Sequence, residues 1–155
     1  SGASLKDPEF RRMLLACLND NPTLGPHLCF EITETAAIGN LAVVNEFIDA
    51  MRGFGCSFAL DDFGSGLSSF TYLKNLKVDY LKIDGAFVRD ITSNPIDRSM
   101  VEAIHRIGNQ MGLKTVAEYV ESEETLALLR QIGVDYVQGN GVHPPEPLEN
   151  LCGKF

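Results

Sequence analysis

Acidic side chains close three short apolar runs of this sequence. Glu31, the pair Asp61 and Asp62, and Glu118 each follow an apolar run and precede a helical pattern. Carboxylate oxygens are the ligands that Mg²⁺ and Mn²⁺ prefer, so four converging carboxylates would predict a divalent-metal site. A single acidic residue at a strand end is more often a solvated loop residue or a helix N-cap. The metal interpretation therefore requires that all four lie together.

A lysine inside an apolar run is the second unusual feature. Lys82 stands between Leu81 and Ile83, and Asp84 follows two residues later. In an extended strand, residues two apart face the same side of the sheet. Most lysines in strands lie at an edge and extend their ammonium group into solvent, but the apolar neighbours here favour an interior strand. Lys82 and Asp84 are therefore candidates for catalysis beside the carboxylates.

Hydrophobic periodicity and turn signals divide the chain into alternating strands and helices. The predicted strands are Leu28–Thr33, Ser57–Asp61, Val78–Ile83, Lys114–Ala117 and Val134–Gln138. The predicted helices run from Asp7-Pro8 to before Asn21, over Leu41–Phe54, near Ser68–Leu73, from Asn94-Pro95 to Gly112, and over Ser122–Ile132.

Five strands that alternate with helices indicate an α/β fold with a parallel sheet, either doubly wound or part of a barrel. Both architectures bring the C-terminal ends of their strands to one rim, where the carboxylates would gather. The pattern begins on a helix, whereas a parallel unit normally begins on a strand. We therefore expect further strands N-terminal to Ser1.

Composition excludes some classes of function. The 155 residues are 45% hydrophobic, enough for one domain or part of one, and the net charge of -8 argues against a nucleic-acid polymer as partner. No apolar run approaches the ~18 residues of a membrane span, so we expect no membrane contact by this segment. Four widely spaced cysteines predict reduced, buried thiols in a cytoplasmic protein. The proline-rich segment 141–155 predicts an irregular tail.

Five motifs together identify a family. They are Glu-Ile-Thr-Glu at 31–34, Asp-Asp-Phe-Gly-Ser-Gly-Leu-Ser-Ser at 61–69, Tyr-Leu-Lys-Ile-Asp at 80–84, Ala-Glu-Tyr-Val-Glu at 117–121, and Gln-Gly at 138–139. In this order and at these spacings, the chain resembles the EAL-domain cyclic di-GMP phosphodiesterases over nearly its whole length. The resemblance implies an incomplete TIM-like (β/α) barrel that lacks its first strands, with residues 1–155 as the C-terminal portion of a single domain. It also implies hydrolysis of cyclic di-GMP to linear pGpG with Mg²⁺ or Mn²⁺.

The resemblance assigns a two-metal site to the acidic residues. Glu31, Asp61 and Glu118 would bind one ion and Asp62 the other, and two ions can clamp a phosphodiester while activating water. Lys82 would lie near the attacking water, where its charge lowers the pKa of that water or orients it.

Other residues would support this site. By the same resemblance, Glu121 and Gln138 would contact the metal ligands and their water, and Glu34 would steady the loop after Asp62. Glu121 has a simpler interpretation, because a carboxylate also stabilises the N-terminus of the helix that follows it. His27, His105 and His143 show no ligand spacing and are predicted to be structural.

Departures from the family pattern affect the expected activity and the fit of the substrate. The Glu-Ala-Leu motif and an asparagine ligand would lie upstream of Ser1, so we expect little activity from this chain alone and an exposed strand edge that favours a homodimer. Upstream sensory or GGDEF domains are expected in the parent protein. Tyr119 stands where the family usually has glycine, and Asn140 where tyrosine is common, which concerns the fit of the substrate.

Three alternatives stay open at this level. The chain would be a degenerate receptor that binds cyclic di-GMP without cleaving it, an enolase-like barrel with a lysine base beside three carboxylates, or a dimerisation module. The retained Lys82 and carboxylates argue against the receptor, and the segment 61–69 fits the enolase-like class poorly.

Overall fold

A single parallel sheet forms the centre of the molecule. The computed structural model describes residues 2–5, 7–64 and 71–147. The strand order is β1-β2-β3-β4-β5, and every neighbouring pair is parallel. The strands are β1 (Cys29–Thr33), β2 (Ser57–Phe63), β3 (Tyr80–Ile83), β4 (Lys114–Ala117) and β5 (Tyr136–Val137). The predicted α/β class with a five-stranded parallel sheet is confirmed, and the described residues form an open part of a (β/α) barrel.

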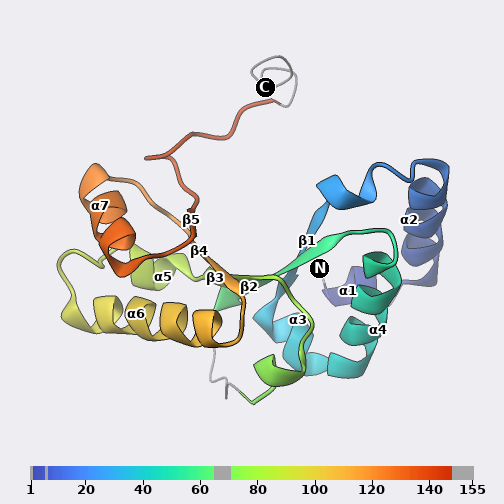
Figure 1. Ribbon diagram of the computed structural model, residues 1–155, viewed down its shortest axis with the longest axis horizontal. Helices are drawn as coiled ribbons and strands as arrows, with labels where there is room; N and C mark the ends of the chain where they lie inside the picture. The colour runs from blue at the N-terminus through green and yellow to red at the C-terminus, as the bar shows by residue number, and fades with distance from the viewer. Residues whose placement is uncertain (1, 6, 65–70, 148–155) are drawn as a thin grey trace.

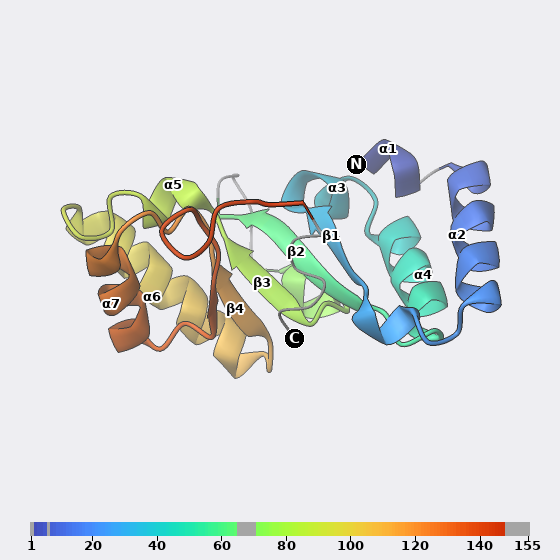
Figure 2. The same cartoon turned by 90° about the horizontal axis from the view of Figure 1, so that it is seen from above.

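Helices flank both ends of this sheet. They are α1 (Gly2–Leu5), α2 (Pro8–Asp20), α3 (Glu34–Gly39), α4 (Leu41–Arg52), α5 (Gly85–Val88), α6 (Pro95–Gln110) and α7 (Glu123–Ile132), with 3₁₀ turns at Gly25–His27 and Leu73–Asn75. Figures 1 and 2 show α5, α6 and α7 beside the end of the sheet that holds β3 and β4, and α1, α2 and α4 beside the β1 end.

Sequence signals set the ends of the long helices. The side chains of Asp7, Asn94 and Ser122 accept hydrogen bonds from backbone N–H groups in the first turns of α2, α6 and α7. Gly133 ends α7 in the left-handed conformation, with φ of 96°, which glycine adopts without strain.

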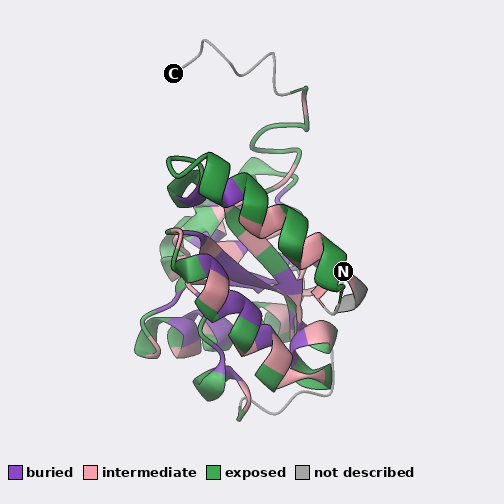
Figure 3. Cartoon of the chain, turned by 90° about the vertical axis from the view of Figure 1, so that its right-hand side faces the viewer, coloured by how far each residue is buried: buried purple, intermediate pink, exposed green. Residues whose placement is uncertain are grey.

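The two faces of the sheet differ in chemistry because side chains alternate along each strand. One face carries apolar residues such as Phe58, Leu60, Leu81 and Ile83, which are fully buried with side chains of the helices. The strands accordingly run through the buried centre of the molecule, while exposed residues concentrate on the outer helix surfaces (Figure 3). The other face carries an open groove lined by Pro26, His27, Leu28, Cys29, Glu31, Ser57, Ala59, Tyr80, Lys82, Val116 and Gln138.

Several predicted boundaries differ from the structure. β2 continues to Phe63, so Asp61 and Asp62 lie within the strand, and β5 is shorter than the predicted 134–138. Short helices α1, α3 and α5 were not predicted, because four to six residues are too few for a helical period to show. Residues 68–70 of the predicted helix near 68–73 lie outside the described residues, and residues 71 and 72 form a turn that leads into the 3₁₀ turn at Leu73–Asn75.

The prediction of buried thiols is wrong for two cysteines. Cys56 is buried, but Cys17 and Cys29 are exposed. Cys29 lines the open groove, where no apolar layer covers it, so an apolar sequence neighbourhood did not imply burial. Cys152 lies outside the described residues.

Two further features concern the lengths of the helices and the tail of the chain. Among the described residues, no helix has both the length and the apolar character needed to span a bilayer. Residues 141–147 contain neither helix nor strand, as predicted for the first half of the tail, and 148–155 lie outside the described residues.

Candidate metal-dependent active site

A β-bulge at the end of β2 places two consecutive aspartates at one centre. Asp61 pairs with Thr33 of β1, but the register between β2 and β3 shifts between Leu60 and Phe63. Asp62 has a φ of 57° within this irregular stretch. A bulge bends the strand and changes the direction of its side chains. Adjacent residues, which would otherwise face opposite sides, can therefore serve one site.

Three of the four carboxylates predicted as metal ligands converge at the C-terminal ends of β2 and β4. One oxygen from each of Asp61, Asp62 and Glu118 lies within 4.8 Å of the other two. Glu118 follows β4 directly, and its backbone N–H donates to the carbonyl oxygen of Ile83 at the end of β3. Parallel pairing of the strands thus brings residues 57 positions apart to one rim, as the sequence predicted.

Lys82 connects this cluster to β1. Its ammonium nitrogen lies 2.9 Å from Glu31 Oε1, 2.8 Å from Asp61 Oδ1 and 2.8 Å from Glu118 Oε1. Only 4% of Lys82 is exposed, whereas 52% of the Glu31 side chain is exposed. The interior position predicted for Lys82 is confirmed, and one buried cation contacts three of the four carboxylates.

The donor set fits a hard divalent ion. Asp61 Oδ1 is buried and lies 2.8 Å from the Lys82 ammonium group, in an ion pair whose angles fall short of hydrogen-bond geometry. A buried carboxylate oxygen without a hydrogen bond is costly unless it has another cationic partner. Oxygen atoms from Asp61, Asp62 and Glu118 within 4.8 Å of one another offer ligands of the kind that Mg²⁺ and Mn²⁺ bind.

Electrostatics within the cluster reflect an excess of negative charge. Burial raises the pKa of Glu118, and Lys82 only partly reverses this effect. Burial, followed by the charges of Asp61 and Asp84, raises the pKa of Asp62. For Lys82, burial by itself would lower the pKa, but contacts with Asp61, Glu118 and Glu31 raise it well above that of free lysine. Lys82 is therefore charged at neutral pH.

Glu34 is buried behind the bulge and binds the backbone after it. Its carboxylate accepts a hydrogen bond from Gly64 N at 3.2 Å and one from the Tyr72 hydroxyl at 2.6 Å. Gly64 has a φ of 98°, a conformation that glycine adopts readily. Sequence reasoning missed Tyr72, because its partner is 38 residues away and no spacing rule connects the two.

Asp84 has a structural contact in addition to its place near the cluster. Its side chain accepts a hydrogen bond from Ala86 N at 2.8 Å and caps α5. Its charge is nevertheless close enough to Asp62 to raise the pKa of that carboxyl. The catalytic role predicted for Asp84 stays a prediction.

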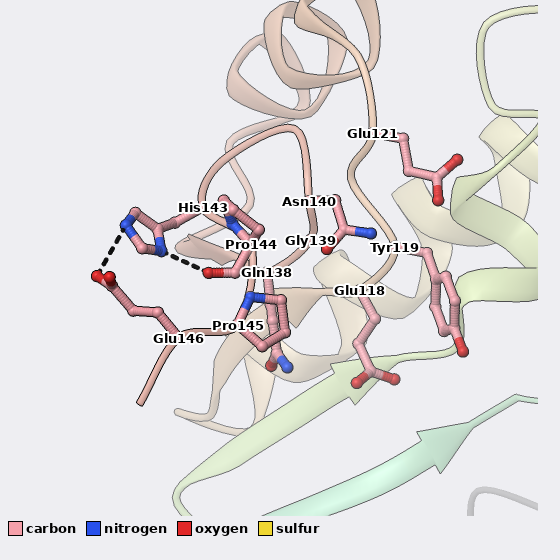
Figure 4. Close-up of a pocket in the computed structure, with 10 residues that line it drawn as sticks. All are labelled: Glu118, Tyr119, Glu121, Gln138, Gly139, Asn140, His143, Pro144, Pro145 and Glu146. Atoms are coloured by element: carbon pink, nitrogen blue, oxygen red, sulfur yellow. Dashed lines mark hydrogen bonds and ion pairs between the residues drawn. The ribbon is translucent and has the colours of Figure 1, made fainter. Parts of the chain in front are cut away.

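A second cavity opens beside Glu118. Its lining residues are Glu118, Tyr119, Glu121, Gln138, Gly139, Asn140, His143, Pro144, Pro145 and Glu146 (Figure 4). Val120 N donates to Gln138 O at 3.1 Å and Gly141 N to Val120 O at 2.9 Å, so the two wall segments are joined by backbone hydrogen bonds. The cavity contains Glu121 and Gln138, both predicted for the site, and it adjoins the carboxylate cluster at Glu118, which belongs to both.

The structure thus separates the nine predicted residues into groups. Five of them form the cluster itself: Glu31, Asp61, Asp62, Lys82 and Glu118. Glu34 lies under the bulge, Asp84 caps the neighbouring helix, and Glu121 and Gln138 line the adjoining cavity.

A family comparison agrees with the motifs. The family described as EAL domain matches residues 1–145 of the chain. The chain belongs to the EAL domain family.

Named EAL relatives and solved structures resemble it over most of its length. The cyclic di-GMP phosphodiesterase PdeB of Shewanella oneidensis is 47% identical over 128 residues, which is 83% of this chain and 15% of the relative. The solved PaMucR phosphodiesterase in complex with c-di-GMP is 31% identical with a TM-score of 0.88, over 97% of this chain and 61% of that one. A manganese and cyclic di-GMP complex of Klebsiella pneumoniae BlrP1 is 29% identical with a TM-score of 0.77, over 88% of this chain and 35% of BlrP1. The chain therefore spans less than two thirds of each of these three proteins.

Proposed function

We propose that this chain carries the main part of an active site that hydrolyses cyclic di-GMP to linear pGpG with Mg²⁺ or Mn²⁺. The single observation that supports this most strongly is the convergence of Asp61, Asp62 and Glu118 around a buried lysine. PdeB is named a cyclic di-GMP phosphodiesterase, and the BlrP1 complex is named for manganese together with cyclic di-GMP.

Glu31, Asp61 and Glu118 would bind one metal ion, and Asp62 the second. Bound Mg²⁺ or Mn²⁺ would supply Lewis-acid activation of the diester and of the attacking water. The carboxylates hold the negative charge that attracts the cations, and the contact of three of them with Lys82 keeps their positions fixed. By the family resemblance, other residues of the full domain would supply the remaining ligands.

Lys82 would act on the attacking water. Its charge, retained at neutral pH, stabilises the negative charge that develops as the water loses a proton. Asp84 would accompany Lys82 at this water. Glu121 and Gln138 would contact the water and ligands from the adjoining cavity, and Glu34 would keep Asp62 in place through Gly64.

The same family resemblance implies the partners of this chain. Cyclic di-GMP would be the ligand, a second copy would pair with the chain as a homodimer, and sensory or GGDEF domains would precede it in the parent protein. We place this activity in the cytoplasm, because the substrate is a bacterial second messenger by family resemblance.

A chimera tests the proposal. Residues 1–155 would be joined to the N-terminal part of the EAL domain of the Shewanella relative, and conversion of cyclic di-GMP to pGpG measured by chromatography with Mn²⁺. We expect hydrolysis by the chimera, loss of it in Asp61→Asn, and little or none by residues 1–155 alone. Binding of cyclic di-GMP without cleavage in a well-folded chimera would contradict the proposal and favour a receptor.

A further inference from the structure

Tyr119 has an unusual backbone conformation at a critical place. Its φ is 54°, in the left-handed region that bulky residues rarely adopt. It directly follows Glu118, whose carboxylate lies 2.8 Å from Lys82. Backbone hydrogen bonds hold the residues on both sides of Tyr119, because Glu118 N donates to Ile83 O and Val120 N donates to Gln138 O. The turn at Tyr119 therefore sets the direction in which Glu118 leaves the sheet.

The ring of Tyr119 packs directly onto the turn after β3. A Cβ atom added to Gly85 would lie 2.1 Å from Tyr119 Cδ2 and 2.7 Å from Cγ, so no other residue fits at Gly85 while the ring stays in place. Gly85 begins α5, three residues after Lys82. The contact thus joins the loop after the lysine strand to the loop after the glutamate strand.

Arg89, the C-cap residue of α5, contacts the ring from the other end of this short helix. Its guanidinium carbon lies 4.2 Å from the centroid of the Tyr119 ring, within range of a cation–π interaction. Half of Tyr119 is exposed, so the residue is not part of the apolar core. Figure 4 shows its ring on the side of Glu118 away from His143 and Glu146. Packing in the core therefore does not account for an aromatic residue in a strained conformation here.

We propose that Tyr119 is a positioning residue, which acts through Gly85 and Arg89 to hold the Glu118 carboxylate beside Lys82 and Asp61. This inference rests on the proposed metal site, because it assigns Glu118 a ligand role. Residues that orient metal ligands affect affinity by about 10- to 100-fold when they are changed. The ring contact is such a support, built from two neighbouring loops.

A substitution and its rescue test the contact. Gly85→Ala should force the ring out of place and weaken Mn²⁺ binding about tenfold, measured by electron paramagnetic resonance of free Mn²⁺ with the 155-residue chain. Tyr119→Gly removes the ring, so adding Gly85→Ala to it should cause no further loss. Tyr119→Phe keeps the ring and should bind Mn²⁺ like the unmodified chain, whereas Tyr119→Leu should bind it more weakly.

A metal-free measurement separates this inference from the proposed function. In nuclear magnetic resonance spectra without metal, the Glu118 amide signal should shift in Gly85→Ala relative to the unmodified chain. In the Tyr119→Gly background, the added Gly85→Ala should leave that signal in place. If the unmodified chain binds no Mn²⁺ but the amide shows this pattern, the proposed metal site fails and the positioning role of Tyr119 stands.

Two results would overturn the inference. One is a Glu118 amide signal that Gly85→Ala does not move in the folded chain. The other is Mn²⁺ affinity within about twofold of the unmodified chain in both Gly85→Ala and Tyr119→Leu, when the expected loss is tenfold.

Discussion

Two polar clusters lie at opposite ends of the strands, and they are built differently. At the C-terminal ends of the strands, Lys82 contacts Glu31, Asp61 and Glu118. At the other end, Thr115 at the start of β4 connects α6 to the residue that precedes β5. We call these the rim cluster and the base cluster.

The base cluster satisfies its polar groups. The Thr115 hydroxyl donates to Asp135 Oδ2 at 3.0 Å and lies 2.7 Å from His105 Nδ1, so it accepts from that nitrogen. Asn109 Nδ2 lies 3.1 Å from His105 Nε2. Lys114 pairs with Asp135 at 2.7 Å, so one cation matches one anion. Such closed networks stabilise a fold and specify its packing.

The rim cluster is the opposite case. Three carboxylates contact one ammonium group, a fourth from Asp62 lies beside two of them, and the ion pair of the buried Asp61 Oδ1 falls short of hydrogen-bond geometry. Burial raises the pKa of Glu118, which means that ionisation there costs free energy. The base cluster is therefore complete within the described residues, whereas the rim cluster has the composition of a cation site.

The largest expected effect is on catalysis at the rim. In the chimera described above, Lys82→Ala should lower the rate of single-turnover hydrolysis by a factor on the order of 10², the usual scale for a positioned electrostatic or proton-transfer group. Affinity for cyclic di-GMP should change little. The matched control is Lys114→Ala, which removes the lysine of the base cluster and should leave the rate unchanged. A near-normal rate in Lys82→Ala would assign that lysine a structural role only.

The second effect is on stability at the base. Thr115→Val keeps the shape of the side chain but removes the hydroxyl, and the groups left without a partner should lower the free energy of unfolding by about 1–3 kcal/mol. Urea unfolding measures this loss. Mn²⁺ affinity should not change, because the base cluster is separate from the carboxylates of the rim. A parallel loss of Mn²⁺ affinity would break the distinction between the two clusters.

The third effect concerns acid. Burial would raise the pKa of Asp135, but hydrogen bonds from Lys114 and Thr115 outweigh it and lower the pKa below 3.8. A carboxyl with a lowered pKa in the folded state stabilises the protein above its unfolded pKa, and this contribution is lost as the pH falls through the folded value. Asp135→Asn should therefore cost more stability at pH 6 than at pH 2.5. An equal loss at both pH values would show that the charge of Asp135 contributes nothing.

The smallest effect has the opposite sign. The pKa of Asp62 is raised in the folded state, so the folded protein favours the protonated carboxyl. This stabilisation by the protonated form is lost as the pH rises through the folded pKa. Asp62→Asn should thus add a few tenths of a kcal/mol at pH 7, a small gain because the exposed charge is screened, and none at pH 3. Asparagine tolerates the φ of 57° found here. Thermal melts at both pH values measure this change in stability, and a loss of stability in Asp62→Asn at pH 7 would contradict the prediction.

Much of the rim could be predicted from the sequence because strand ends follow from local patterns. Apolar runs that precede Glu31, Asp61 and Glu118 predict that each lies near the C-terminal end of a parallel strand, and such ends share one rim. The interior position of Lys82 follows equally from its apolar neighbours.

The rest depended on contacts between distant residues. The bulge that turns Asp62 arises from the register of β2 against β3, which no residue in β2 announces. The hydrogen bond from Tyr72 to Glu34 and the contact of Tyr119 with Gly85 likewise join separate segments. Cys29 was misjudged because burial depends on which face of the sheet is covered, not on the apolar run that contains it.

A paired Mn²⁺ titration tests the central claim most directly. Free Mn²⁺ would be measured by electron paramagnetic resonance for the 155-residue chain, for Asp61→Asn at the rim and for Asp135→Asn at the base. We expect weak binding by the unmodified chain, because Glu31, Asp61, Asp62 and Glu118 would supply only part of the ligand set that the family resemblance implies. We expect equal binding by Asp135→Asn and a loss of at least about tenfold in Asp61→Asn, since a neutral amide is a poorer ligand for a hard cation. No Mn²⁺ binding, or the same affinity in both variants, would contradict the assignment of the rim cluster as a metal site.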